Sequence, residues 1–138
     1  MSNGIIVPIL DYTEFNYAWA TGATEEQVIA DRIPVAPFTK IGLSVRLHRR
    51  TIGTGGSFQF IIRGINPSAK DGQDYVFPTD LASTPTVVTT TTVPTVLQLS
   101  TLITDPQQPM IRVILRTIGP SAGAMFAIFS ADLVMKTG

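Results

Sequence analysis

The sequence predicts an all-β fold, an antiparallel β-sandwich with seven or eight strands. Apolar and polar residues alternate with period two over residues 41–48 and 111–116, which is typical of strands with one buried and one wet face. Clusters of Gly, Pro, Asn and Asp separate the apolar segments. The chain of 138 residues suffices for one domain and is too short for two ordinary ones.

The first 38 residues are expected to form an N-terminal arm that belongs to the same unit as a sandwich over residues 39–138. Residues 5–15 are apolar but contain Pro8, which cannot donate to a strand ladder, so they predict an edge strand or an extended arm. Thr24 and Gln27 have the spacing of a helix capping box, which predicts at most one short helix, over residues 24–30.

The remaining strands are predicted from turn signals and strand propensities. A Gly-rich turn after residue 53 joins two alternating runs, which predicts an antiparallel hairpin. The segment 84–101 is rich in Thr and Val and predicts one or two strands that divide near Pro94. Residues 125–136 are apolar at both alternating sets of positions. This pattern predicts a strand buried on both faces, either by the arm or by another subunit.

The composition limits the class of protein. Charged residues make up 14% of the chain, against about 25% in typical soluble domains, so the surface is either rich in neutral Thr or partly covered by neighbouring subunits. The absence of cysteine excludes disulfides and thiolate metal sites. No membrane span or targeting segment is expected, because no apolar run is long enough and the first basic residue is Arg32.

The charges are unevenly distributed along the chain. Residues 1–31 hold five acids and no Lys or Arg, whereas residues 32–63 hold six bases and no acid. An acidic arm beside a basic sheet pairs within one chain or between chains. Most of the candidate basic residues fall on predicted wet strand faces, and the set comprises Arg46, Arg49, Arg50, Arg63, Arg112 and Arg116. Surface or intramolecular pairing and a protein interface both fit this set, and nucleic acid is disfavoured because no aromatic residues are interleaved for base stacking.

The sequence does not predict an enzyme or a bound cofactor. The single histidine, His48, lies beside Arg49 and Arg50 on a wet face, which disfavours a zinc site. The run of residues 53–57 lacks the Lys-Ser/Thr ending of a phosphate loop and is better explained as a turn. Acidic residues 71, 74 and 80 share a predicted loop without the EF-hand spacing, so solvated carboxylates are favoured over a calcium site.

Aromatic residues cluster near the N-terminus, namely Tyr12, Phe15, Tyr17 and Trp19. Exposed rings stack on sugars or anchor a protein partner, so Tyr12 and Trp19 are candidate interface residues. The alternative is that the rings attach the arm to the sandwich.

The C-terminal segments PMIRVILRTIGP (residues 109–120) and AMFAIFSADLVMK (residues 124–136) resemble the closing hairpin of small virion proteins from tailed bacteriophages. The resemblance implies a jelly-roll-like sandwich that decorates or cements a capsid, often as a trimer. It also implies the major capsid protein as a partner and a place in the virion after assembly in the host cytoplasm. No functional residue carries over from it.

Three functions are therefore weighed. A structural virion protein, either a capsid decoration protein or a main coat protein, accounts for the low charge and the doubly apolar last strand. A carbohydrate-binding sandwich predicts exposed rings among Tyr12, Tyr17, Trp19 and Tyr75. An enzyme requires a polar pocket around His48, which the strand pattern does not favour.

Overall fold

The computed structural model describes residues 4–17, 22–35, 38–67, 74–76, 80–102 and 110–137. Within these residues the chain forms strands and no helix, so no helix of the described chain is able to span a membrane. The strands are β1 (Gly4–Tyr17), β2 (Thr24–Pro34), β3 (Lys40–Ile52), β4 (Ser57–Pro67), β5 (Asp74–Val76), β6 (Ala82–Ser83), β7 (Thr95–Leu102), β8 (Met110–Ile118) and β9 (Met125–Lys136).

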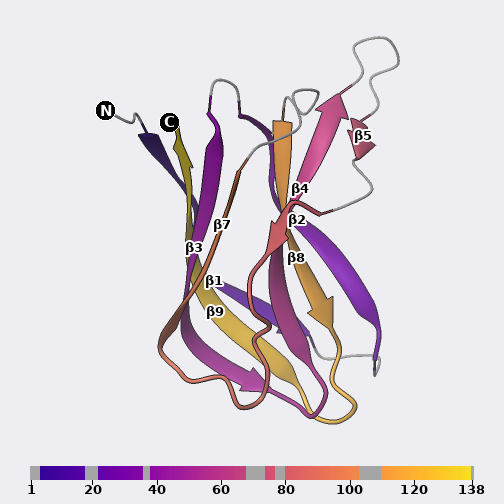
Figure 1. Ribbon diagram of the computed structural model, residues 1–138. Helices are drawn as coiled ribbons and strands as arrows, with labels where there is room; N and C mark the ends of the chain where they lie inside the picture. Colours follow the sequence, from indigo (N-terminus) through magenta and orange to yellow (C-terminus); the bar gives the residue numbers. More distant parts are fainter. Residues whose placement is uncertain are drawn as a thin grey trace.

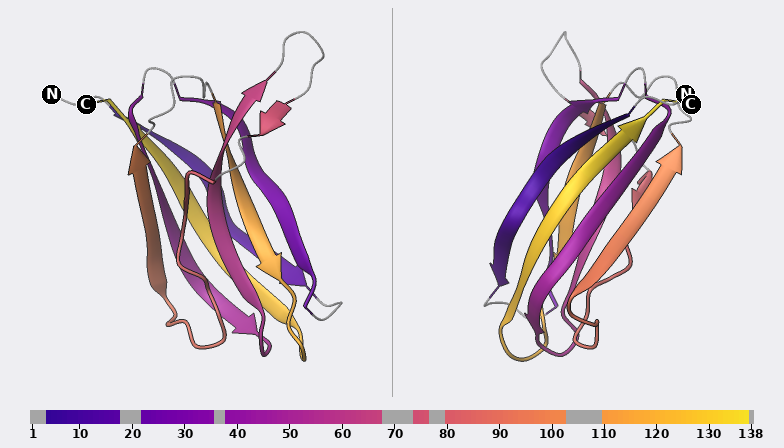
Figure 2. Two further views of the ribbon diagram at one scale, coloured as in Figure 1. Left: turned by 45° about the vertical axis from the view of Figure 1, so that its right-hand side comes forward. Right: turned by 90° about the vertical axis from the view of Figure 1, so that its left-hand side faces the viewer.

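These strands form two antiparallel sheets that face each other (Figure 1). Sheet A has the order β1-β9-β3-β7, and sheet B has the order β2-β8-β4-β5, with β6 also paired to β4. The predicted all-β antiparallel sandwich is therefore confirmed. Figure 2 shows sheet A face on, with β1 and β7 as its outermost strands.

The pairing follows the pattern of a jelly roll. The first half of the chain pairs with the second half in reverse order, as β1 with β9, β2 with β8, β3 with β7, and β4 with β6. The pairs β3·β9 and β4·β8 then join these ribbons into two sheets. A long antiparallel ribbon rolled in this way generates two Greek keys. The chain termini consequently lie close together, as Figure 1 shows.

The predicted hairpins are wrong in one respect. The Gly-rich turn at residues 53–56 joins β3 of sheet A to β4 of sheet B, and the turn at 119–124 joins β8 of sheet B to β9 of sheet A. The strands on either side of each turn therefore do not pair with each other. A short turn that spans the roughly 10 Å between two facing sheets has the same Gly-rich composition as a hairpin turn, and only the distant pairing partners distinguish the two.

The predicted helix over residues 24–30 is also wrong, because these residues belong to β2. Register partners run from Thr24 opposite Ile118 to Pro34 opposite Met110. Tertiary pairing with β8 overrides the local capping signal. The segment expected as an arm thus supplies one edge strand to each sheet, and Pro8 lies on the edge strand β1, where its missing N–H is tolerated.

The core fills the space between the sheets. The alternating residues Ile41, Leu43, Val45 and Leu47 of β3 are all buried, as the period-two pattern predicts. Phe129 of β9 lies at the centre, and its ring contacts rings from both sheets. The inward residues of β9 are buried, but its outward residues Phe126, Ile128 and Val134 are only half-buried. The N-terminal segment does not cover them, since β1 lies beside β9 in the same sheet.

Candidate interaction surfaces

Three of the predicted arginines lie together on the outer face of sheet B. Arg63 on β4 and Arg116 on β8 both contact Glu26 on β2, at 3.0 Å and 2.9 Å. Arg63 Nε also donates to Asp80 Oδ1 at 2.7 Å, and Arg116 lies 3.7 Å from the other oxygen of Asp80. Two acids from separate segments thus hold two arginines from adjacent strands in one network.

The third arginine forms a similar contact beside this network. Arg112 Nε donates to Asp31 Oδ1 at 2.8 Å, and Arg112 Nη2 donates to Asp31 Oδ2 at 3.3 Å. This fork geometry fits a planar guanidinium to a carboxylate. Asp31 also accepts a bond from the Arg32 backbone N–H at 2.9 Å, where the backbone of Arg32 has a φ of 52°. The β2 strand is therefore attached to β8 by side chains as well as by its ladder.

These contacts change the ionisation of the acids. The hydrogen bonds from Arg63, and secondarily from Arg116, lower the pKa of Glu26 from its ordinary 4.5 to about 2, although partial burial opposes the shift. The hydrogen bonds from Arg112 lower the pKa of Asp31 in the same way. The hydrogen bonds to Glu26 and Asp80 raise the pKa of Arg63. All three shifts favour the charged forms, as expected for close opposite charges.

The ionic network also shields apolar residues. Ile61 on β4 and Ile114 on β8 pair across the strands and, by the alternation of their strands, lie on the outer face of sheet B. Both are nonetheless almost fully buried, at 0% and 2% exposed. In the register, Arg116 and Gln59 form the next outward row on one side, and Arg112 and Arg63 form the row on the other. The aliphatic stems of such arginines cover apolar surface while their charged ends remain in water.

Arg46 lies on the opposite face of the molecule, on sheet A. Both of its terminal nitrogens donate to Asp132 Oδ2 at 3.1 Å. The neighbouring His48 Nε2 lies 2.7 Å from Ser130 Oγ, and the Ser130 hydroxyl also accepts the Tyr12 N–H at 3.2 Å. The Tyr12 ring stacks on His48 with centroids 4.1 Å apart, and Tyr12 remains 68% exposed.

The His48–Ser130 pair lacks the third group of a catalytic triad among the described residues. Asp132, the nearby carboxylate, bonds Arg46 rather than the imidazole. Ser130 is 3% exposed and accepts a backbone N–H, so its hydroxyl is held within the sheet. A triad requires the base to be oriented by a carboxylate and the nucleophile to be reachable. No group of three His, Cys, Asp or Glu side chains in the described residues is arranged to hold a metal ion.

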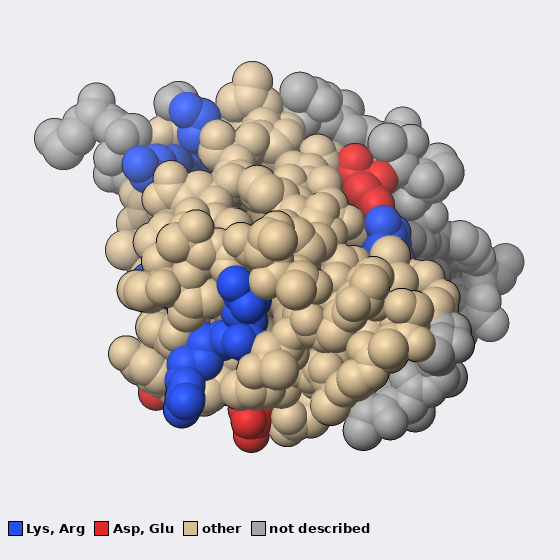
Figure 3. All heavy atoms as spheres, turned by 90° about the horizontal axis from the view of Figure 1, so that it is seen from below, with Lys and Arg blue, Asp and Glu red and all other residues tan. Residues whose placement is uncertain are grey.

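The last two arginines lie near the end of β3, beyond a register shift between Leu47 and Arg49. Arg50 Nε donates to the Thr91 carbonyl at 2.6 Å, whereas Arg49 is exposed. Viewed from below, the molecule shows a run of basic side chains on a mostly neutral surface, with further basic groups at the upper left and, beside acidic side chains, at the right (Figure 3).

The structure thus divides the predicted basic set between two faces and one end. Arg63, Arg112 and Arg116 are brought together on sheet B, while Arg46 lies on sheet A. The contacts match the alternative of intramolecular pairing with the acidic N-terminal residues. The role of these residues in a protein interface stays a prediction. Trp19 lies outside the described residues, as does Asp71 of the loop considered for calcium, whereas Asp80 is paired with Arg63.

Two of the N-terminal aromatic residues serve the core. The Phe15 ring lies 6.2 Å from Phe129, and the Tyr17 ring lies 5.9 Å from Phe58. These contacts fit the alternative in which the rings attach the N-terminal strand to the sandwich. Tyr12 differs from them, because its ring lies on the outer face.

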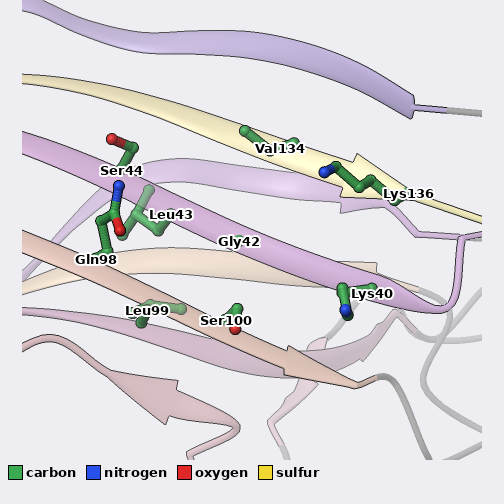
Figure 4. A pocket seen from close by; sticks show the side chains of 9 residues that line it. All are labelled: Lys40, Gly42, Leu43, Ser44, Gln98, Leu99, Ser100, Val134 and Lys136. Atoms are coloured by element: carbon green, nitrogen blue, oxygen red, sulfur yellow. The ribbon is translucent and has the colours of Figure 1, made fainter.

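A shallow groove of about 330 Å³ on the outer face of sheet A was not predicted. It lies over Gly42, between β9 and β7, where the missing side chain leaves the sheet surface open (Figure 4). Lys40 and Lys136, which are exposed and directly opposite each other in the register, lie at one end, and Ser44 and Gln98 lie at the other. A glycine at a wet position of an otherwise alternating strand was the available signal.

Comparison with known proteins supports the fold. The chain matches the crystal structure of the VP2 subviral particle of infectious bursal disease virus with a TM-score of 0.59 and 18% identity, over 99% of this chain and 33% of that one. Structures of the Gx strain of this virus and of a mutant VP2 in derived T=1 particles give the same TM-score, each with 16% identity over 99% of this chain and 32% of theirs.

The chain therefore spans about a third of the length of the VP2 chains it matches. At this level of identity the likeness shows a shared fold. No protein-family model matches the chain. No curated protein matches it significantly.

Proposed function

We propose that this chain is a structural component of a viral capsid and that it acts through contacts between subunits. The observation that carries the proposal is the match of both sheets, over nearly the whole chain, to a coat protein solved in assembled particles. Jelly-roll sandwiches recur in capsid and lectin domains. Because one fold hosts many functions, the proposal also needs support from the surface of this molecule.

The outer face of sheet A provides that support. Phe126, Ile128 and Val134 of β9 are half-buried within one chain, and Ile6 of β1 is 68% exposed. Exposed apolar side chains gathered on one sheet face mark protein contacts more often than singly scattered ones do. The strong ion pairs of sheet B, by contrast, are already satisfied within the chain.

The narrower roles expected from the sequence belong to the same proposal. As a decoration or cement protein, the chain would bind a major capsid protein, with a homotrimer as the favoured form, and would reside in the virion. As a main coat protein, it would form the shell itself. The resemblance to bacteriophage proteins and the match to VP2 of infectious bursal disease virus agree on a viral particle and differ in the source, and the match does not support a bacteriophage origin.

The test is the mass of the purified chain by light scattering over a range of concentrations, at low and high salt, with negative-stain microscopy of any large species. The expected result is a defined oligomer or a closed particle. A monomer at every concentration and salt, with no binding to preformed shells, would contradict the proposal. A shell-sized particle would favour a main coat protein, and a trimer would favour decoration.

A carbohydrate-binding role is the second candidate, and one observation favours it. Tyr12 presents a ring that is fixed by stacking on His48 and is still 68% exposed. Such a ring is suited to stack on the apolar face of a sugar. A glycan array with the wild-type chain and with Tyr12→Ala separates the two roles, since only a glycan-binding chain loses signal on this substitution.

A further inference from the structure

The edges of the two sheets differ in how they are protected from pairing with other strands. An edge strand exposes backbone N–H and C=O groups, and proteins usually guard it with charges, Pro, bulges or short length. On β1, the guards are Pro8, Asp11, Glu14 and two register shifts against β9. On β2, they are four charged residues within the strand and two register shifts against β8.

The edge of sheet B that lies opposite β2 is protected because its strands, β5 and β6, are short. β5 has three residues and β6 has two, so neither offers a long ladder to a partner. Three of the sheet edges therefore carry a recognisable guard.

The remaining edge, β7, carries none of these guards. Its eight residues, TVLQLSTL, include no charge and no Pro. The strand pairs with β3 from Thr95 to Leu102 without a register shift. The hydrogen bonds described for its backbone on the ladder all go to β3, and the neighbouring segment at residues 84–87 bonds to β4 instead. Among the described residues, the side of the β7 backbone that faces away from β3 thus has no hydrogen-bonded strand partner.

The side chains of β7 add an apolar component to this open edge. The even-numbered residues 96, 98, 100 and 102 point to the outer face and are exposed. Among them, Val96 is 53% exposed and Leu102 is 56% exposed. An uncharged, straight and partly apolar edge of this length is a predicted site of strand addition.

We propose that β7 pairs with β7 of a second copy of this chain, antiparallel, about a two-fold axis at Leu99. Residues directly opposite each other in an antiparallel pair share a face, so each outward residue must oppose an outward residue. With the axis at Leu99, Val96 opposes Leu102 of the partner subunit, and Gln98 opposes Ser100 of the partner subunit. These are the two most exposed apolar residues of the strand, and the two-fold axis repeats their contact at both ends of the seam.

A second copy fits this edge better than an unrelated strand for two reasons. The outer face of the strand is self-complementary in this register, because apolar Val96 and Leu102 oppose each other across the seam, as do polar Gln98 and Ser100. It also carries no charge, so that self-pairing places no like charges opposite each other. The two sheets A would join into one continuous eight-stranded sheet, and the grooves over Gly42 would lie on either side of the new seam.

This inference names a contact for the subunit assembly proposed above and rests on that assembly for the identity of the partner. The seven residues from Val96 to Leu102 that pair in this register make a small contact, so we expect a weak dimer in solution. Many such weak contacts acting together would suffice in a closed particle.

The test is site-specific cross-linking, which benefits from the absence of native cysteine. Val96→Cys combined with Leu102→Cys places a thiol pair at each of the two outer positions of the proposed seam. Within one chain these residues are six apart, which is about 20 Å along a strand, too far for an intrachain disulfide. Under mild oxidation the double variant should run mainly as a covalent dimer that reductant reverses.

The controls are the two single-cysteine variants and the off-register pair Val96→Cys with Gln98→Cys. All three should remain largely monomeric, because the proposed register separates their thiols. Equal cross-linking in the controls, or no dimer in the V96C/L102C variant, would overturn the inference. As a second test, Val96→Lys should weaken self-association at least tenfold by sedimentation equilibrium, whereas Val28→Lys on the other sheet should leave it unchanged; equal affinities would count against the seam.

The two proposals can fail separately. If the wild-type chain forms oligomers but V96C/L102C gives no dimer, the β7 seam is wrong and the capsid proposal stands. If V96C/L102C gives the dimer but no larger assembly or shell binding occurs, the seam is supported and the capsid proposal fails. A monomer with no cross-link overturns both.

Discussion

Glu26 is the carboxylate that joins two arginines of sheet B. It contacts Arg63 and Arg116, whose side chains are only 18% and 32% exposed. Removing the partner of a partly buried guanidinium lowers the free energy of unfolding more than removing the partner of an exposed one, because water solvates the unpaired N–H groups poorly.

We therefore expect Glu26→Gln to lower the free energy of unfolding by about 1 kcal/mol, at the upper end for exposed ion pairs. The matched control is Glu25→Gln, since Glu25 is an exposed neighbour on the same strand without a described ion pair. Urea denaturation measures both. Equal values for the two variants would show that the network contributes nothing.

The same contacts predict how stability depends on pH. The folded chain keeps Glu26 charged down to about pH 2, and the pKa of Asp31 is lowered as well, while the unfolded chain protonates such groups near their ordinary values. Folded-state pKa values below the unfolded ones give stability that is present above about pH 4.5 and lost as pH falls toward 2.

We expect the free energy of unfolding to decline over this window, and the decline to be shallower in the double variant Glu26→Gln with Asp31→Asn. Urea titrations at pH 7, 4 and 3 measure this. A double variant whose stability falls as steeply as that of the wild type would assign the acid sensitivity to other carboxylates.

For single residues, the sequence predicted correctly which arginine side chains point outward. Period two correctly placed Arg46, Arg63, Arg112 and Arg116 on outward positions, because the pleat alone decides that alternation. It did not reveal which sheet each strand joins, so it did not separate Arg46 from the other three. The acids that pair with them lie about 17 to 90 positions away in sequence, where no local pattern reports proximity.

At the scale of elements, Phe129 connects the two sheets. It lies on β9 in sheet A, and its ring contacts Phe58 and Phe60 of β4 in sheet B, with centroids 5.7 Å and 5.0 Å apart. Both contacts are edge-on, at 81° and 86°, a favoured geometry for aromatic pairs.

Replacing Phe129 by Ala should cost about 3–5 kcal/mol, because the lost contacts leave a cavity between the sheets. Phe126→Ala is the matched control, since this residue lies on the same strand, points outward and is half-buried; its expected cost is about 1 kcal/mol. Urea denaturation compares them. Should Phe129→Ala fail to fold, Phe129→Leu provides a milder variant. Its loss of unfolding free energy should still exceed that of the Phe126→Ala control.

The two predictions that the structure contradicts, the hairpins and the short helix, also concern whole elements. The turn at residues 53–56 has the composition of a hairpin turn but crosses between the sheets. Its glycine is needed for packing, because a Cβ on Gly53 would clash with the Ala122 carbonyl of the opposite turn. Ser121 N–H donates to the Thr54 carbonyl at 2.7 Å, which joins the two turns. Local composition favours a turn but does not choose between a hairpin and a crossing.

At the scale of the whole molecule, the jelly roll makes the N-terminal segment part of the fold. β1 pairs with β9 from Gly4 opposite Lys136 to Tyr17 opposite Met125, and Phe15 is buried in the core. Since β9 is the central strand between β1 and β3, loss of β1 would leave a long apolar strand at the edge of sheet A.

Deleting residues 1–17 should therefore unfold or aggregate the entire domain, whereas removal of an attached arm would leave a stable sandwich. Far-UV circular dichroism, thermal unfolding and size-exclusion chromatography distinguish the two outcomes. A control with Asp11→Asn and Glu14→Gln removes the exposed charges of β1 while keeping its ladder, and should remain folded. A truncated chain that is soluble and unfolds at the wild-type temperature would mean that the strands from β2 to β9 hold the fold without β1, and that the first strand serves contacts outside the sandwich instead.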